Sequence, residues 1–412
     1  MPAETMASDC NSAHAAGESA PPKRAGISPA TLHVLTLTPF FPSQENDVNG
    51  CFIKEPLDSL VQQGVASSVI AATPIHHGRR WPHAAAPATW VRYPQLPGYL
   101  GLPGAGPLLY ARLLPVVSRL HRERPVNLIH AHAALPCGRA AALLARRFQI
   151  PFVVTVHGLD VFYSGSLAGA RANFLRRASI GVYQAARTVV CISERVRQIL
   201  QESVSSDIRS AVVHNGVDAE LFSPGAAGDT LRGEILIVGN LIPSKGQELV
   251  LRAIHRMAAD FPHLQCRIIG EGPDRSRLEA LAHKLGISQR IHFLGRQSRA
   301  AVADAMRCCS VFVLSSRSEG LGCVYLESMA CAKPVIACRG QGIEEVIQHE
   351  KNGWLISPDS LDELVQGLST LLQPSDLSSR LGLAARQTVL DGLTLYHQAQ
   401  KLLGVYREAA AR

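Results

Sequence analysis

Short apolar runs alternate with helical patterns along almost the whole chain. Residues 32–37 read as a buried strand, and residues 51–63 then carry their apolar side chains at helical spacing. After this first unit, further strand patterns lie at residues 67–72, 88–93, 126–129, 152–156, 188–192 and 211–213. Residues 94–107 are rich in Pro and Gly, so we expect a long irregular segment there, before a helix over residues 108–120.

The same alternation resumes after residues 224–233, PGAAGDTLRG, whose composition is typical of a linker. The second set of strand patterns lies at residues 234–238, 265–269, 290–293, 311–314 and 335–337. Strands that alternate with helices favour parallel sheets that are covered by helices on both faces. We therefore predict an α/β fold of two doubly wound, Rossmann-like domains that face a cleft.

These patterns also give the expected domain boundaries. The chain should divide into a disordered tail (1–30), a first domain (31–223), the linker (224–233), a second domain (234–390) and a last helical segment (391–412). The tail is rich in Ala, Ser, Pro and charged residues and lacks the apolar core of a signal peptide. No run of 18 apolar residues occurs, so the sequence predicts no membrane-spanning helix.

Positive charge is concentrated in the first half. The net charge is +8, and residues 31–223 hold 18 Lys and Arg residues against 11 Asp and Glu residues. This excess suits an anionic membrane surface or a phosphate-bearing partner, while a merely basic surface is the plain alternative. Nucleic acid is not expected, because no binding motif accompanies the charge. The ten cysteines form no C-x-x-C pair, which favours reduced thiols in a cytoplasm.

Residues 314–338, LSSRSEGLGCVYLESMACAKPVIAC, combine two acids with glycines at a predicted strand–helix junction. Glu319 lies in the loop after the strand, and Glu327 lies two turns into a helix predicted over residues 321–332. Ligands of open α/β sheets bind at this carboxyl end of the strands. Gly320 and Gly322 leave backbone N–H groups uncovered beside a helix N-terminus, which suits a phosphate. Two acidic residues at the solvent-exposed start of a helix are common, so this pair by itself does not indicate a binding site.

The whole composite is more specific. The motif S-E-G-x-G, then Glu327, then A-x-P-V-I-A and G-x-G-x-E-E resembles the donor-sugar signature of family 4 glycosyltransferases, retaining enzymes of the GT-B fold. The family's two glutamates, which have seven residues between them, fall on Glu319 and Glu327. The resemblance implies that Glu327 binds the ribose hydroxyls of a nucleoside diphosphate sugar and that Glu319 contacts the transferred sugar. It also places Leu321, between the two glycines, in the donor site.

The resemblance extends over nearly the whole chain from about residue 32. It implies a first domain on the acceptor side, a second domain that binds the donor, and a last helix that crosses back to the first domain. Lys245 lies in the Gly-flanked loop VGNLIPSKG, where a lysine can meet a diphosphate as a point charge, unless it is simply solvated. Where the family usually has an arginine, this chain has Asn240, and the sequence does not show what replaces the lost charge. The remaining donor-site candidates are Lys245, Asn240, Gly50, Gly270 and Gly272.

The first domain offers its own candidates at predicted strand ends. His157 ends a strand within T-x-H-G-x-D, and the resemblance turns it toward the donor sugar. Asn49, His132 and Asp160 are acceptor-side candidates. His130 and His132 end one strand, and we expect them to alternate, so that only one faces the cleft.

The function predicted from these residues is retaining transfer of a sugar to a hydroxyl of a glycan or lipid-linked acceptor, in polysaccharide or glycolipid synthesis. The departing diphosphate would take the acceptor's proton, and Lys245, Gly322 and Gly50 would neutralise it. No D-x-D pair or metal-ligand spacing occurs, so no metal or cofactor besides the nucleotide sugar is expected. The enzyme would work in the cytoplasm, with a peripheral contact at the inner face of the membrane as an option. The alternatives are a GT-B nucleotide-sugar epimerase or hydrolase, and a non-catalytic glycan-binding protein.

Overall fold

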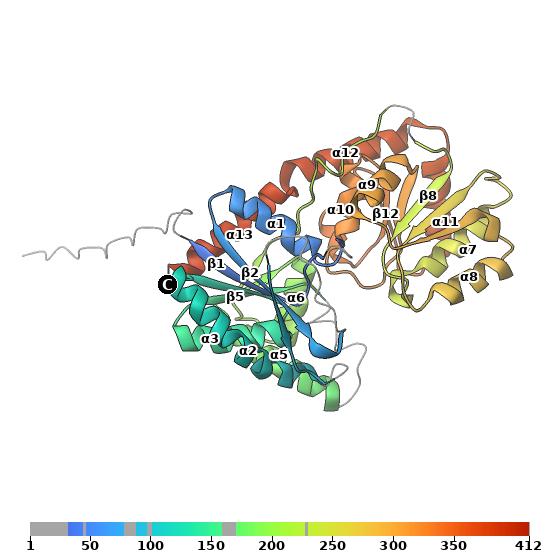
Figure 1. Cartoon of the computed structure of the whole chain (residues 1–412). Coiled ribbons are helices and arrows are strands. Elements are labelled where there is room, and N and C mark those ends of the chain that lie inside the picture. Colours follow the sequence, from blue (N-terminus) through green and yellow to red (C-terminus); the bar gives the residue numbers. More distant parts are fainter. Residues whose placement is uncertain are drawn as a thin grey trace, which may run out of the picture.

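The computed structural model describes residues 32–43, 47–77, 88–96, 101–158, 170–226 and 230–411. It contains two parallel sheets, one on each side of residue 230 (Figure 1). The prediction of an α/β fold with two doubly wound, Rossmann-like domains is confirmed.

The first sheet has seven strands in the order β3-β2-β1-β4-β5-β6-β7, and all neighbours pair in parallel. Its strands are β1 (His33–Thr38), β2 (Ala66–Pro74), β3 (Thr89–Tyr93), β4 (Leu128–His132), β5 (Phe152–Val156), β6 (Thr188–Cys191) and β7 (Ser210–Val212). The helices of this domain are α1 (Cys51–Gln62), α2 (Leu102–Glu123), α3 (Arg139–Phe148), α5 (Ala170–Ala185) and α6 (Glu194–Ser203).

The second sheet has six strands in the order β10-β9-β8-β11-β12-β13. Its strands are β8 (Glu234–Val238), β9 (Gln265–Ile269), β10 (Ile291–Gly295), β11 (Val311–Leu314), β12 (Val335–Cys338) and β13 (Trp354–Ile356). The helices after the linker are α7 (Gln247–Met257), α8 (Arg275–Lys284), α9 (Arg299–Cys308), α10 (Cys323–Ala330), α11 (Leu361–Leu372), α12 (Asp376–Gly392) and α13 (Leu395–Ala410).

Alternation of side chains along β1 supplies both faces of the first sheet. Leu35 and Leu37 are buried in the core that contains α2 and α3, whereas Val34 is buried in a second cluster with α1 and α13. In Figure 1, α2, α3 and α5 lie along one side of this sheet, and α1 and α13 lie along the other. The last helix of the chain therefore belongs to the core of the first domain, where Tyr406 is fully buried.

Two helices differ from their predicted limits. The helix predicted over residues 321–332 is shorter, because Gly322 and Ala332 have φ of +84° and +57°, outside the helical region. In contrast, α2 begins at Leu102, within the segment that we expected to be irregular. Pro103 lies in its first turn, where a missing N–H costs nothing, and the fully buried side chain of Leu109 anchors the helix on the sheet.

Candidate active site

In each sheet the strand order reverses at one point, and several of the predicted site residues lie at these two points. In the first sheet the strand order reverses between β1 and β4, and in the second between β8 and β11. Ligands of open α/β sheets bind outside the carboxyl ends of the strands at such switch points. The loop after β1 leads to Gly50, β4 ends at His132, and the loops after β8 and β11 carry Lys245 and Glu319.

Lys245 and Glu319 form an ion pair between these two loops of the second domain. Their side chains are 19% and 11% exposed, so the pair is largely screened from solvent. The loops are also joined through their backbones, since the Arg317 N–H donates to the Ser244 carbonyl at 2.8 Å. The Glu319 N–H donates to the side chain of Gln341 at 2.9 Å. Both charged groups are therefore held in place at the switch point.

The loop from Gly320 to Gly322 connects this ion pair to the N-terminus of α10. Gly322 caps the helix with φ +84°, a conformation that favours glycine. A Cβ on Gly320 would lie 3.1 Å from the His157 carbonyl oxygen, so glycine lets the two domains approach closely. The Ser193 hydroxyl, which also caps α6, donates to the Gly320 carbonyl at 2.5 Å.

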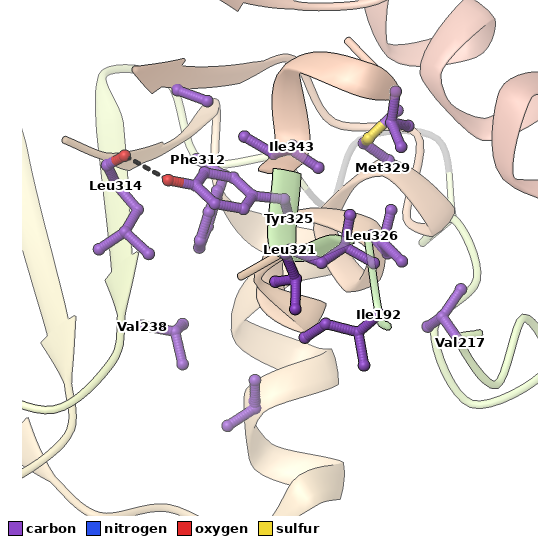
Figure 2. Packing of buried hydrophobic residues seen from close by; sticks show 14 of the residues in the cluster. Ile192, Val217, Val238, Phe312, Leu314, Leu321, Tyr325, Leu326, Met329 and Ile343 are labelled. Atoms are coloured by element: carbon purple, nitrogen blue, oxygen red, sulfur yellow. Dashed lines mark hydrogen bonds between the residues drawn. The ribbon is translucent and has the colours of Figure 1, made fainter. Parts of the chain in front are cut away.

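The side chain of Leu321, which the sequence placed in the donor site, is fully buried in the core beneath the loop. Figure 2 shows it among Tyr325, Leu326 and Ile192. The Tyr325 hydroxyl donates to the Leu314 carbonyl at 2.6 Å and ties α10 to β11 (Figure 2). Any contact of Leu321 with a donor would therefore come from its backbone.

Glu327 is also buried, with a side chain that is 6% exposed, and it forms an ion pair with Arg299 of α9. Arg299 forms a second ion pair with Glu55 of α1, in the first domain. Burial raises the pKa of Glu55 to about 6, against the attraction of Arg299. Burial disfavours the charged guanidinium, but Glu327 and Glu55 together raise the pKa of Arg299 above its ordinary value. Neither Arg299 nor Glu55 was predicted from the sequence as a site residue.

The other donor-site candidates also lie at strand ends. Gly50 is the N-cap of α1 with φ +81°, and Asn49 beside it is exposed. Asn240 is exposed after β8, and its carbonyl accepts a bond from Gln247 at 2.9 Å. Gly270 and Gly272 follow β9 and lie so close to the loop after β8 that a Cβ on either would clash with its backbone.

A cluster of histidines occupies the facing edge of the first sheet. Nδ1 of His132 lies 2.9 Å from Nε2 of His157. His130 lies 2.6 Å from both the Tyr406 hydroxyl and the Thr155 hydroxyl. Burial lowers the pKa of His157 to about 4 and that of His130 to about 3, and it lowers the pKa of His132 well below its ordinary value. All three rings are therefore neutral at pH 7.

The expectation that only one of His130 and His132 would face the site is wrong. The two residues are two positions apart on β4, and side chains at that spacing leave the same face of a strand. Their ring centroids are 4.3 Å apart, and both rings line one cavity with His157. The cavity extends to Phe52 of α1 and Tyr406 of α13.

The cavity has room for about one water molecule, with a volume of about 20 Å³. Nε2 of His132 is buried there and has no hydrogen-bond partner among the described residues. A buried polar nitrogen of this kind is usually satisfied by ordered water. Asp160, the remaining acceptor-side candidate, lies outside the described residues.

A second contact between the domains was also missed by sequence reasoning. The carboxylate of Glu345 accepts the backbone N–H groups of Glu194 and Arg195 at 2.8 and 2.7 Å, at the start of α6. His214 lies 3.0 Å from the same carboxylate. The motif G-x-G-x-E-E was visible in the sequence, but nothing in it indicated that Glu345 meets the N-terminus of α6.

Within the described part of the chain, no group of three or more His, Cys, Asp or Glu residues could hold a metal ion. None of the described helices is both long and apolar enough to cross a membrane.

Two family models match the chain, one in each domain. The model described as Glycosyltransferase Family 4 matches residues 53–221, and the model described as Glycosyl transferases group 1 matches residues 228–388. An uncharacterized glycosyltransferase of Methanocaldococcus jannaschii is 34% identical over 258 residues, which are 62% of this chain and 68% of that protein. A D-inositol 3-phosphate glycosyltransferase of Mycobacterium avium is 30% identical over 308 residues, which are 70% of this chain and 71% of that protein.

Solved structures agree in fold. Sucrose-phosphate synthase from Thermosynechococcus elongatus matches with a TM-score of 0.78 at 19% identity, over 91% of this chain and 98% of that one. Anabaena HepE in complex with UDP-glucose matches with a TM-score of 0.72 at 18% identity, over 91% and 99%. The two-domain architecture, the family matches and the relatives lead to one conclusion: the chain belongs to glycosyltransferase family 4 and is a glycosyltransferase of the GT-B fold.

Proposed function

We propose that this enzyme transfers a sugar, with retention of anomeric configuration, from a nucleoside diphosphate sugar to a hydroxyl of a glycan or lipid-linked acceptor. The observation that carries the proposal is the Lys245–Glu319 pair, which lies at the switch point of the second sheet beside the N-terminus of α10. A cation, a helix N-terminus and a partly buried carboxylate are the groups that a diphosphate and a cation-like sugar require.

The donor would extend along the second domain. The carboxylate of Glu327 suits the two hydroxyls of a ribose, since it can accept two hydrogen bonds. Lys245 and the backbone N–H groups after Gly322 face the position of the diphosphate, and Gly50 opens a second helix N-terminus in the first domain. These groups supply the attraction that Asn240, which is uncharged, does not. Neither a metal ion nor a further cofactor is part of the proposed site.

The neutral histidines support a front-face mechanism. A ring whose pKa is about 4, as in His157, is a weak base at pH 7 and is poorly suited to deprotonate an acceptor hydroxyl. In the proposed reaction the acceptor oxygen forms its bond to the anomeric carbon on the face from which the diphosphate leaves, and a diphosphate oxygen takes the hydroxyl proton. Glu319 stabilises the positive charge that develops on the sugar. His157 contributes a neutral hydrogen bond to the donor sugar.

The compared proteins suggest which substrates to test first. HepE was solved with UDP-glucose, which makes uridine diphosphate sugars the first donors to examine. D-inositol 3-phosphate glycosyltransferases have a phosphate in the named substrate, and the basic first domain suits an acceptor with such a group.

The donor is identified in two steps. In a thermal shift assay with a panel of nucleotide sugars, the true donor should raise the unfolding temperature of the enzyme, because a ligand that binds only the folded state stabilises it. Transfer to candidate acceptors then follows with that donor. Consumption of the donor that is unchanged by every acceptor, with an epimerised or hydrolysed sugar as the product, would contradict the proposal.

A lipid-linked acceptor would bring the first domain to an anionic membrane at the inner face of the cell. On α5, Arg176 and Arg177 are exposed, and Phe174 beside them is 56% exposed. Basic and aromatic side chains together suit such a surface. Sedimentation with anionic vesicles should show binding that weakens as salt rises, with neutral vesicles as the control. No binding to anionic vesicles at low salt would reject the membrane contact.

A further inference from the structure

Arg299 is a single buried cation that joins the two domains. Its Nη2 donates to both oxygens of Glu55 at 2.7 and 2.9 Å, and its Nε donates to one of them at 3.0 Å. On its other side, Nη1 donates to Oε1 of Glu327. The Arg299 side chain is 11% exposed, so solvent screens these charge-assisted bonds only weakly.

The same residue also holds the loop that leads to Gly50. The Arg299 N–H donates to the carboxylate of Asp47 at 3.2 Å. Its guanidinium carbon lies 4.8 Å from the centroid of the Phe222 ring, which limits how the side chain can rotate. We call Arg299, Glu55, Glu327 and Asp47 the Arg299 cluster.

The geometry distinguishes this cluster from an ordinary interdomain salt bridge. Arg299 binds only Oε1 of Glu327, and Oε2 accepts no hydrogen bond within the described part of the chain. A planar guanidinium that is fixed by Glu55 on one side holds the Glu327 carboxylate in one orientation, with its second oxygen left for a ligand. The opposite end of the cluster fixes α1 one turn after Gly50, where the proposed diphosphate contact lies.

We propose that Arg299 is a positioning residue that couples the ribose contact at Glu327 to the placement of the Gly50 loop over the diphosphate. The proposal rests on the proposed function, since it assumes a nucleoside diphosphate in this site. It assigns Glu55 an effect on donor binding although Glu55 itself does not touch the donor. An interdomain bridge with no such coupling would change stability but not nucleotide affinity.

The test measures the dissociation constants of UDP, GDP and ADP by calorimetry and follows the nucleotide that the wild-type enzyme binds best. Arg299→Gln should weaken its binding about 10-fold or more, the size expected when charge-assisted bonds are lost. Glu55→Gln should weaken it by a smaller factor, roughly threefold. The double variant should bind no more weakly than Arg299→Gln alone, because the Glu55 effect acts through Arg299.

Two further variants sharpen the test. Arg299→Lys keeps the charge but not the planar fork, so it should bind the nucleotide more weakly than wild type. Arg256→Gln removes the exposed bridge to Asp362 and serves as the matched control, with wild-type affinity expected. Circular dichroism checks folding, and if Arg299→Gln does not fold, Glu55→Gln and Arg299→Lys decide.

The outcomes separate this proposal from the proposed function. Wild-type affinity in folded Arg299→Gln, or in both Glu55→Gln and Arg299→Lys, would overturn the coupling while leaving the donor site intact. Tighter binding in Arg299→Gln would also overturn it, since Arg299 would then compete with the ribose for Glu327. If the wild-type enzyme binds none of the three nucleotides and Glu327→Gln leaves the donor KM unchanged, the proposed function fails and this proposal fails with it.

Discussion

The two sides of the candidate site use different chemistry. The first domain presents His130, His132 and His157, which burial keeps neutral at pH 7. The second domain presents charge, in the Lys245–Glu319 and Arg299–Glu327 pairs. We call these the histidine side and the charged side.

The difference indicates how the work of transfer is divided. A diphosphate and a cation-like sugar need charged partners, and fixed charges in a partly buried site act more strongly than they would in water. An acceptor hydroxyl needs hydrogen bonds and exclusion of water, which neutral rings beside Phe52 can provide. Electrostatic stabilisation of the reaction is therefore expected from the second domain, whereas the first domain is expected to place the acceptor and to give the donor sugar one neutral hydrogen bond from His157.

Removal of the charge at Glu319 should break this division most severely. Glu319→Gln keeps the size of the side chain but removes the negative charge beside the reacting sugar. Because that interaction strengthens in the transition state, kcat should fall by roughly 10²-fold, more than donor affinity falls. Steady-state kinetics with saturating donor measures this, with Glu279→Gln in an exposed i,i+4 ion pair on α8 as the control. A folded Glu319→Gln variant with near wild-type kcat would contradict the assignment.

Glu327→Gln should act on the same side in a different way. The proposed ribose contact would be made in the ground state and the transition state alike, so its loss should mainly raise the donor KM. Hydrogen bonds to charged groups contribute roughly 1.5–3 kcal/mol, which predicts an increase of about 10-fold or more. The comparison of KM and kcat for the two glutamate variants is the measurement. Equal effects on both constants in both variants would show that the carboxylates do not have separate roles.

The histidine side should make the stability of the folded protein sensitive to acid. In the unfolded chain these histidines become protonated below a pH of about 6.5. In the folded chain the rings stay neutral until the pH falls to about 4 at His157 and to about 3 at His130. The contribution of these histidines to the free energy of unfolding should therefore be constant above pH 7 and fall as the pH drops from 6.5 toward 4, by about 1.4 kcal/mol per pH unit for each histidine.

Urea unfolding at pH 7, 6 and 5 measures this slope. His130→Gln removes one of the titrating groups and should flatten the slope, while its amide can still bond to Tyr406 or Thr155. A slope identical to that of the wild-type enzyme would mean that His130 does not titrate differently in the folded and unfolded states.

The smallest expected effect tests whether the charged side is sufficient by itself. Because Lys245 and the helix N-termini supply the proposed diphosphate contacts, transfer should persist in EDTA at close to its original rate. Assays before and after chelation, with Mn²⁺ added back, give the answer. Complete loss in EDTA with recovery on Mn²⁺ would assign the neutralisation of the diphosphate to a metal.

Sequence reasoning reached the parts of this site that depend on local order. Glu319 and Lys245 each lie in a loop between a strand and a helix, so the alternation of elements was enough to place both at one edge of one sheet. The pair that they form was not predicted, because it depends on how two loops 74 residues apart are packed. The error at His130 and His132 was of another kind, since residues two apart on a strand share a face.

The contacts between the domains could not be predicted from the pattern of hydrophobic and polar positions. Arg299 and Glu55 are separated by 244 residues and lie on helices whose charged positions look like ordinary solvated faces. Their burial results from the way the two domains pack, and hydrophobic periodicity within a single element carries no information about that. The same reason explains why Glu345 was not predicted to cap α6.

The place of α13 has a consequence for biosynthesis. The cluster that contains Val34 and Ile53 also contains Leu402, Leu403 and Tyr406, so one face of the first domain is built from both ends of the chain. Domains usually fold as they leave the ribosome, beginning with the N-terminal one. Here the first domain to be made must expose part of its apolar face until α13 has been synthesised. The nascent chain is therefore expected to depend on protection by chaperones for longer than its domain order suggests.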